Sequence, residues 1–257
     1  MCFDHDSEPP IPSGDGAVTT EDLTLTADDG NELLAFSAHG AEESPAAVVV
    51  LPDVRGLYQF YKDLAVRFAS VGHDAIAIDY FGRTTDFEDR PDDWDFWPHV
   101  EKCSVEGVSA DVAAAVARLR ENHPDRRVFT VGFCFGGSHS WHQAANGHGL
   151  AGAVGFYGKP RRSEDDAVIE RVGDMTCPIL ALMGGDDPGI PEEAVREYRR
   201  ALERAGVGHE VVVYPGAPHS FFDRKYSEFA DESADAWTRV LAFIDANTGN
   251  LSRRSFR

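Results

Sequence analysis

Residues 131–138 read Val-Gly-Phe-Cys-Phe-Gly-Gly-Ser; a short apolar run precedes this stretch and a helix-compatible segment follows it. Its centre is Gly-x-Cys-x-Gly, the nucleophile-elbow pattern G-x-S-x-G with a thiol in place of the hydroxyl. A nucleophile on a sharp turn from strand to helix has a strained backbone, so its neighbours two residues away must be small. Gly132 and Gly136 meet this need because they have no Cβ to clash. The turn is expected to lift Cys134 above the sheet edge, at the positive end of the next helix, where a thiolate is favoured.

The motif alone leaves two interpretations open, because a buried structural cysteine in a glycine-rich turn has the same sequence. Two later loops favour the catalytic interpretation. Residues 183–188, Met-Gly-Gly-Asp-Asp-Pro, and residues 215–221, Pro-Gly-Ala-Pro-His-Ser-Phe, each follow a predicted buried strand. The order nucleophile, acid, base along the chain is that of α/β-hydrolases, in which the His takes the nucleophile's proton and the acid orients the His. The predicted triad is therefore Cys134, His219 and either Asp186 or Asp187.

Strand and helix patterns alternate along nearly the whole chain, which predicts an α/β fold with a mostly parallel, doubly wound sheet. An Asp-Asp-Gly turn at 28–30 predicts an antiparallel hairpin at the N-terminal side. Since no linker or change of composition interrupts the pattern, we expect one domain, 18–248, between a flexible arm, 1–17, and a tail, 249–257. Strands are predicted at 18–26, 32–38, 46–51, 75–79, 127–131, 150–156, 178–183 and 210–214, and helices at 57–71, 105–120, 138–145, 191–205 and 227–247.

The loop at residues 52–56 follows the first buried parallel strand. In hydrolases of this fold, that loop supplies one N–H donor of the oxyanion hole, and the residue after the nucleophile supplies the other. The donors here would be Val54 and Phe135. Asp53 would lie near the thiol, where its carboxylate raises the pKa of the thiol by like-charge repulsion or accepts its proton. A surface aspartate in a turn is the alternative interpretation of Asp53.

Residues 80–104 form a long stretch without clear periodicity that carries several aromatic residues among many acids. Such a stretch serves as a lid or a binding wall, or its rings only attach the loop to the body, and both interpretations stay open. His139 and His142 share a face of the helix after the elbow. Because no acid or third histidine accompanies them at ligand spacing, we predict no metal site.

The composition is strongly acidic, with 44 Asp and Glu against 24 Lys and Arg and a formal net charge of −20. This balance argues against binding to nucleic acids and to anionic membranes. Residues 1–16 lack the apolar segment of a signal peptide, and no run approaches the length of a membrane span. None of the four cysteines forms a C-x-x-C pair, so zinc-finger and thioredoxin-like sites have no support. We expect a cytoplasmic, reducing setting, which suits a free catalytic thiol.

From about residue 18 to the closing helix, the chain resembles the dienelactone hydrolase family. The most specific matches are residues 132–137, 183–187 and 219–221, and the loop at 52–56 matches a family loop with Asp53 in place of Glu. The resemblance implies an α/β-hydrolase fold, no cofactor, and a Cys-Asp-His triad whose acid is Asp187. It also implies hydrolysis of an enol-lactone by transfer of the acyl group to sulfur and then to water.

The chain departs from the family pattern where the substrate would bind. The best-known members hold the substrate carboxylate with two arginines, and the matching positions here are Asp223 and a position near Asp93. Acids in place of a carboxylate clamp predict weak use of carboxylate-bearing lactones and better use of neutral esters or lactones. The candidate substrate-binding residues are Arg55, Arg83, Arg90, Trp97, Tyr157, Phe221 and Arg224.

These observations predict a cysteine-dependent hydrolase of ester or lactone bonds that forms an acyl-thioester intermediate. We expect a small-molecule substrate and a monomer or small homo-oligomer. One alternative on the same fold is a thioester hydrolase or an acyltransferase. An alternative from another class is a non-catalytic protein that uses Cys134 as a redox or ligand sensor.

Overall fold

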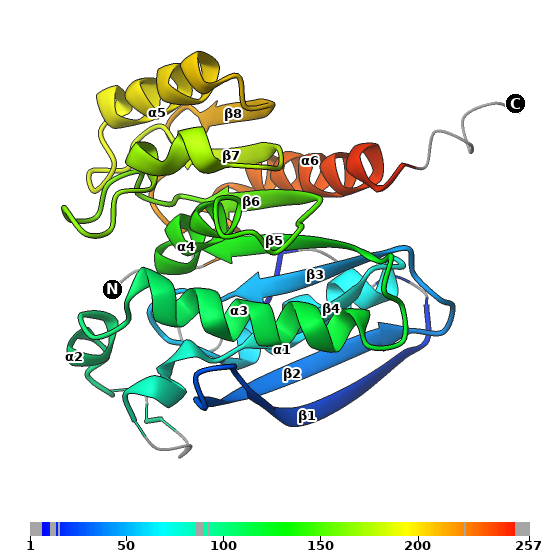
Figure 1. Ribbon diagram of the computed structural model, residues 1–257. Coiled ribbons are helices and arrows are strands. Elements are labelled where there is room, and N and C mark those ends of the chain that lie inside the picture. The colour runs from blue at the N-terminus through cyan, green and yellow to red at the C-terminus, as the bar shows by residue number, and fades with distance from the viewer. Residues whose placement is uncertain are drawn as a thin grey trace, which may run out of the picture.

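The computed structural model describes residues 7–10, 14, 16–85, 90, 91, 93–223 and 225–249. Its framework is an eight-stranded sheet in the order β1-β2-β4-β3-β5-β6-β7-β8 (Figure 1). β1 pairs with β2 and β2 with β4 in antiparallel fashion, and all further neighbours are parallel. The predicted mostly parallel sheet with an antiparallel N-terminal hairpin is confirmed. The strands are β1 Val18–Thr26, β2 Glu32–Gly40, β3 Ala46–Leu51, β4 Asp74–Ile78, β5 Arg127–Phe133, β6 Gly152–Phe156, β7 Ile179–Gly184 and β8 His209–Tyr214.

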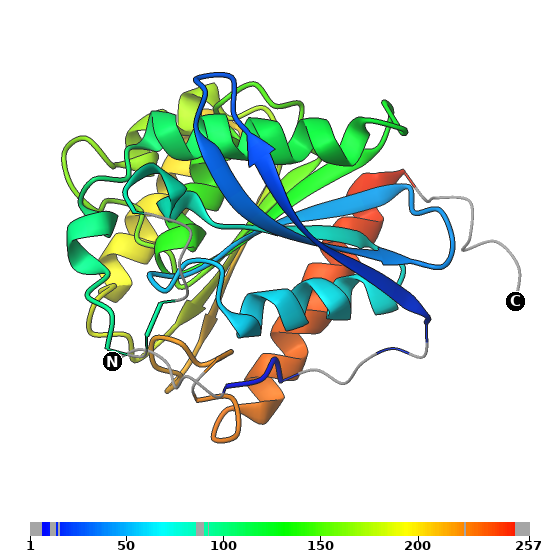
Figure 2. The same cartoon turned by 90° about the horizontal axis from the view of Figure 1, so that it is seen from below.

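Helices cover both faces of the sheet. Figure 2 shows the cyan α1 and the orange-red α6 on one face, and the green α3 on the other. α1 and α6 meet through Phe68 and Trp237, whose ring centroids are 4.7 Å apart, and α4 meets α5 through Trp141 and Tyr198 at 4.9 Å. None of the described helices is long and apolar enough to cross a membrane. The helices are α1 Gln59–Ser70, α2 Trp97–Val100, α3 Val105–Arg120, α4 Phe135–Gln143, α5 Glu192–Ala205 and α6 Ala230–Thr248, with 3-10 helices η1 Tyr80–Arg83 and η2 Val168–Asp174.

The central strands are buried along their whole length, which explains why they read as continuous apolar runs rather than as alternating patterns. Every residue of β3, β4, β6 and β7 is buried between the two helical layers. β1 lies at the edge of the sheet and is mostly exposed. The sheet therefore supplies a rigid base, and its loops at the carboxyl ends of β5, β7 and β8 carry the predicted triad.

Two sequence-based boundaries need correction. α4 begins at Phe135 rather than at residue 138, because Cys134 itself is the residue that precedes the first helical turn. The stretch 80–104 is not wholly irregular, since it contains η1 and α2. Asp79 fixes the start of η1, where its side chain accepts a hydrogen bond from the Phe81 N–H at 3.2 Å.

The described parts of the predicted arm contact the body of the molecule. Pro9 is buried, and the N–H of Gly14 donates to the Ser70 hydroxyl of α1 at 2.8 Å. The side chain of Ser7 hydrogen-bonds Asp223, in the loop that also carries His219. The tail from residue 250 lies outside the described residues.

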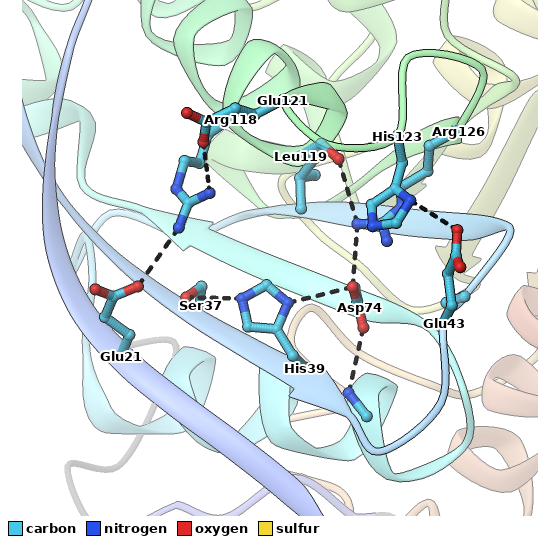
Figure 3. A network of polar contacts seen from close by, with 12 residues as sticks. Glu21, Ser37, His39, Glu43, Asp74, Arg118, Leu119, Glu121, His123 and Arg126 are labelled. Atoms are coloured by element: carbon cyan, nitrogen blue, oxygen red, sulfur yellow. Dashed lines mark hydrogen bonds and ion pairs between the residues drawn. The ribbon is translucent and has the colours of Figure 1, made fainter.

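A polar network lies at the amino ends of the parallel strands, at the opposite end of the sheet from the loops after β5, β7 and β8 (Figure 3). Asp74, the first residue of β4, accepts hydrogen bonds from the Gly40 N–H and from His39, both at 3.2 Å. It also forms an ion pair with the buried Arg126 at 3.0 Å. The network joins β2, β4 and the segment after α3, so it anchors the amino ends of the strands away from the predicted triad.

The start of α4 packs directly against the end of β3. A Cβ at Gly136 would overlap with the carbonyl oxygens of Leu51 and Pro52, and a Cβ at Gly132 would overlap with the carbonyl oxygen of Gly136. Neither glycine has a positive φ angle. The requirement for glycine here is therefore close backbone approach rather than an unusual backbone conformation.

We predict that Gly136→Ala lowers the free energy of unfolding by about 1–3 kcal/mol, because the methyl group has backbone rather than flexible side chains to displace. Gly173→Ala is the matched control, since a Cβ there meets nothing within 4 Å. Its effect should stay within about 0.5 kcal/mol. Urea unfolding followed by circular dichroism measures both, and equal stabilities of the two variants would contradict the packing argument.

Candidate active site

The loops after three strands of the sheet bring Cys134, Asp187 and His219 to the carboxyl ends of the parallel strands. Each residue follows a strand, β5, β7 and β8 respectively. The loops after β7 and β8 are in backbone contact, because the N–H of Asp186 donates to the Ala217 carbonyl at 2.9 Å. A Cβ at Gly184 would lie only 2.6 Å from that same oxygen, so the two loops approach as closely as glycine allows.

His219 is hydrogen-bonded on both sides. Its Nδ1 lies 2.6 Å from Asp187 Oδ2, and its ring also hydrogen-bonds the Cys134 side chain. Asp187 is buried, and its other oxygen accepts the Gly189 N–H at 2.8 Å. Asp186 is exposed. Of the two adjacent acids that the sequence left open, Asp187 is the one that contacts the histidine.

The surroundings of His219 favour its protonated form. Burial lowers the pKa of the imidazole, but the hydrogen bonds to Asp187 and Cys134 and the charges of both groups outweigh burial and raise the pKa to about 10. The ring therefore keeps its proton at neutral pH.

Backbone strain is concentrated at this site. Within the described part of the chain, the non-glycine residues with positive φ are Cys134 at 54°, Tyr157 at 38° and Ser220 at 60°. Tyr157 follows β6, and its ring centroid lies 4.9 Å from that of His219, while Ser220 is the next residue after His219. Such conformations persist only where surrounding contacts impose them, and they are common at functional sites.

The two predicted oxyanion donors come from adjoining segments. No protein acceptor is found for the backbone N–H of Val54 or of Phe135 among the described residues. The loop that carries Val54 is fixed by Tyr80, whose hydroxyl donates to the carbonyl oxygens of Pro52 and Asp53. Sequence reasoning missed this role of Tyr80, although its position just beyond β4 placed it at the same sheet edge as the triad.

Asp53 is bound by Arg55 within the same loop. The Arg55 guanidinium donates to both carboxylate oxygens of Asp53, at 2.9–3.2 Å, and also to Asp223 Oδ2. The side chains of Arg55, Asp53 and Asp223 are all buried. Because the Asp53 carboxylate is already engaged by Arg55, a direct partnership of Asp53 with Cys134 stays a prediction.

Two of the other candidate substrate-binding arginines are held by acids. Arg90 pairs with Asp79, stacks on the Trp94 ring at 4.7 Å and, with Arg55, lines a cavity of about 560 Å³. Arg83 pairs with Asp29 of the β1–β2 hairpin and with the buried Asp111 of α3. The contacts of Arg83 therefore hold the hairpin against α3 and do not bring it to the triad.

The remaining candidates occupy different environments. Tyr157 lies at the site, whereas Phe221 is fully buried with its ring 5.7 Å from that of Tyr157 and belongs to the core. Trp97 is exposed on α2. Arg224 lies outside the described residues.

One of the two histidines of α4, His142, pairs with an acid that the sequence spacing could not reveal. His142 Nε2 lies 2.9 Å from Asp166, which also pairs with Arg162, and the Arg162 guanidinium lies 4.3 Å from the Phe135 ring centroid. His139 is buried, which lowers the pKa of its imidazole to about 3 and keeps it neutral. No group of three His, Cys, Asp or Glu side chains among the described residues is arranged to hold a metal ion. A guanidinium takes the place beside Asp166 where a metal cation would have to bind.

Comparison with known proteins identifies relatives along almost the full chain. The model of the "Dienelactone hydrolase family" matches residues 34–247. A protein of Salmonella typhimurium named "Putative carboxymethylenebutenolidase" is 31% identical over 252 residues, covering 91% of this chain and 90% of that protein. A Bradyrhizobium protein named "Probable 2-oxo-3-(5-oxofuran-2-ylidene)propanoate lactonase" is 30% identical and covers 77% of this chain and 82% of its own length.

A solved structure shows the same architecture. The crystal structure described as "Putative Dienelactone Hydrolase" from Klebsiella pneumoniae superposes with a TM-score of 0.77 at 28% identity, covering 89% of this chain and 98% of that one. The family match spans the sheet from β2 and the segments that carry Cys134, Asp187 and His219. The chain therefore belongs to the dienelactone hydrolase family, has the α/β-hydrolase fold and is a hydrolase.

Proposed function

We propose that this hydrolase cleaves an ester or lactone bond of a small molecule, with Cys134 as nucleophile, His219 as acid and base, and Asp187 as the group that orients His219. The observation that carries the proposal is the position of the His219 ring, which is hydrogen-bonded to Asp187 on one side and to Cys134 on the other. The names of the relatives point to the same bond type, since both describe enzymes that open a lactone ring.

In the first half-reaction, the Cys134 thiolate attacks the carbonyl carbon and a carbon–sulfur bond forms. The negative charge that develops on the carbonyl oxygen would be stabilised by the N–H groups of Val54 and Phe135, for which the described residues offer no other acceptor. When the tetrahedral intermediate collapses, the carbon–oxygen bond breaks and the leaving oxygen takes the proton of the His219 imidazolium. In a lactone, this step opens the ring and leaves the new hydroxyl on the bound acyl chain.

In the second half-reaction, His219 is neutral and accepts a proton from water, which attacks the acyl-thioester. The carbon–sulfur bond then breaks, the carboxylic acid is released, and the thiolate and imidazolium are restored. Asp187 keeps Nδ1 of the ring protonated throughout, so that the other nitrogen faces the reacting atoms. The positive end of α4 also stabilises negative charge that develops at Cys134, the residue before its first turn.

The same geometry fits a catalytic Cys134 better than it fits a redox or ligand sensor. Sensing by oxidation needs an accessible thiolate, which Cys134 could supply. It does not need an acid that orients the histidine or two N–H donors without acceptors. These features favour catalysis.

Substitutions of the proposed nucleophile and base should separate their two roles. Cys134→Ala should abolish p-nitrophenyl acetate turnover, and His219→Ala should lower kcat/KM by about a thousandfold or more. Acid quenching during the first turnovers should trap an acetyl group on the peptide that contains Cys134. Cys103→Ala is the control, because Cys103 is buried, and burial raises the pKa of its thiol to about 12. Normal ester turnover by Cys134→Ala would refute the proposed mechanism.

The two adjacent acids provide a matched pair. Asp187→Asn should lower kcat by about 10⁴-fold, because the amide no longer holds the histidine tautomer. Asp186→Asn should change kcat by no more than a few-fold, since Asp186 is exposed and only its backbone contacts the neighbouring loop. Steady-state kinetics on one aryl ester distinguish them. The opposite order of damage would show that Asp186 is the catalytic acid.

The pH dependence follows from the raised pKa of His219. Below about pH 10 the ring carries the proton that the leaving oxygen needs, and above it this proton is lost. The kcat/KM of the wild type should therefore fall as pH rises through about 10. Asp187→Asn removes a hydrogen bond that raises the pKa of His219, so its alkaline limb should move to lower pH. A pH–rate profile corrected for spontaneous hydrolysis measures this, and a wild-type limb near 7 would contradict it.

A further inference from the structure

Arg55 is a fully engaged cation at the edge of the site. Its guanidinium is shared between Asp53 and Asp223 and lies 5.3–5.8 Å from the ring centroids of three aromatic residues. Its side chain is 3% exposed, so its contacts lie in a low-dielectric interior where ion pairs and cation–π contacts are strong. A substrate anion that takes the place of Asp223 at Nη2 would have to displace that aspartate. The three rings belong to Tyr58, Phe60 and Tyr61.

Among the described residues, the ion pairs of Arg55 join two acids to one base. Asp53 and Asp223 share a single guanidinium, so the group carries a net negative charge when both acids are ionised. Tyr157, whose ring lies beside His219, is within electrostatic range of Asp223, Asp53 and Cys134, which places the cluster next to the nucleophile. A carboxylate brought to this place would add a second uncompensated charge.

Two buried polar atoms of this region have no hydrogen-bond partner in the part of the chain that the structure describes. One is Asp223 Oδ1 and the other is the Tyr157 hydroxyl. Buried polar atoms are nearly always hydrogen-bonded, so an unsatisfied acceptor and donor near the nucleophile indicate a place for a polar ligand group. Neutral groups have the chemistry that each atom needs, because a hydroxyl or ester oxygen accepts from the Tyr157 hydroxyl and a hydroxyl donates to Asp223 Oδ1.

We propose that Asp223 is a specificity-determining residue: by occupying Arg55 it excludes substrates with a free carboxylate beside the scissile bond and selects neutral esters and lactones. This inference rests on the proposed function and names its substrate class. Displacing Asp223 from Arg55 would leave a buried carboxylate without its counter-ion, which makes the exchange unfavourable. The relatives, by contrast, carry names that describe carboxylate-bearing lactones.

The test compares two substrates that differ by one charge, dienelactone and its methyl ester. For the wild type at pH 7.5, kcat/KM should be about 100-fold higher for the methyl ester, in line with the cost of placing like charges together. Asp223→Asn keeps the shape of the side chain and removes the charge of one of the two acids that share Arg55. It should reduce the ratio of the two kcat/KM values by about tenfold or more.

Asp93→Asn is the matched control. It removes the same formal charge from an exposed side chain, so the ratio should stay within about twofold of the wild type. A narrowed ratio in both variants would overturn the assignment to Asp223, because it would report only the overall charge of the protein.

A second measurement needs no variant. Burial raises the pKa of Asp223 to about 6, in opposition to Arg55. As the pH falls from 7.5 to 5.5, Asp223 should gain a proton, and its ion pair with Arg55 should weaken. The wild-type ratio of kcat/KM for the methyl ester to kcat/KM for dienelactone should then fall by about tenfold. Any pH effect of His219 and Cys134 on the chemical step is common to both substrates and cancels in the ratio. Among the described residues, the groups that interact with Asp223 are Asp53 and Arg55 from the loop after β3, Tyr61 from α1, Tyr157 after β6, and Ser7 of the arm.

A preference of the wild type for dienelactone over its methyl ester would overturn the inference while supporting the proposed function. A ratio that neither Asp223→Asn nor low pH narrows would also overturn it. If the folded wild type turns over neither lactone and no aryl ester, the proposed function fails, and the inference fails with it.

Discussion

The backbone contact between Gly136 and the end of β3 is the constraint on which the catalytic edge depends. It lets α4 start immediately after Cys134 and lie against the Leu51–Pro52 carbonyls. Two consequences follow from one contact. Cys134, the proposed nucleophile, is held at a positive φ, and the first turn of α4 lies against the start of the loop that carries Val54. Any side chain at position 136 would separate the nucleophile from that loop.

Charge is organised locally, although the protein as a whole is strongly acidic. At the triad, Asp187 and Cys134 both favour the protonated histidine, and this outweighs the cost of burying its charge. At the neighbouring cluster, Asp53 and Asp223 compete for one guanidinium, and burial raises the pKa of Asp223 to about 6. The two groups thus titrate in different ranges of pH, His219 near 10 and Asp223 near 6.

The parts of the molecule away from the nucleophile provide rigidity. Asp74 connects β2, β4 and the segment after α3 at the amino ends of the strands (Figure 3). Beneath the elbow, the half-buried ion pair of Asp166 with Arg162 positions a guanidinium against the Phe135 ring. Such support matters because strained residues such as Cys134 and Tyr157 keep their conformations only when their surroundings are fixed.

The sequence by itself determined the alternation of strands and helices, the order of Cys134, an acid and His219, and the glycines that a strand-to-helix turn requires. These are local properties, because each depends on periodicity or on the conformational freedom of a few consecutive residues. The tertiary structure decided which acid meets the histidine, since Asp186 and Asp187 differ only in the direction in which the folded loop turns them. It also decided the partners of Arg55, which lies 168 residues from Asp223 along the chain. Pairings over such distances depend on how loops from separate strands converge at one sheet edge, and residue spacing carries no record of that convergence.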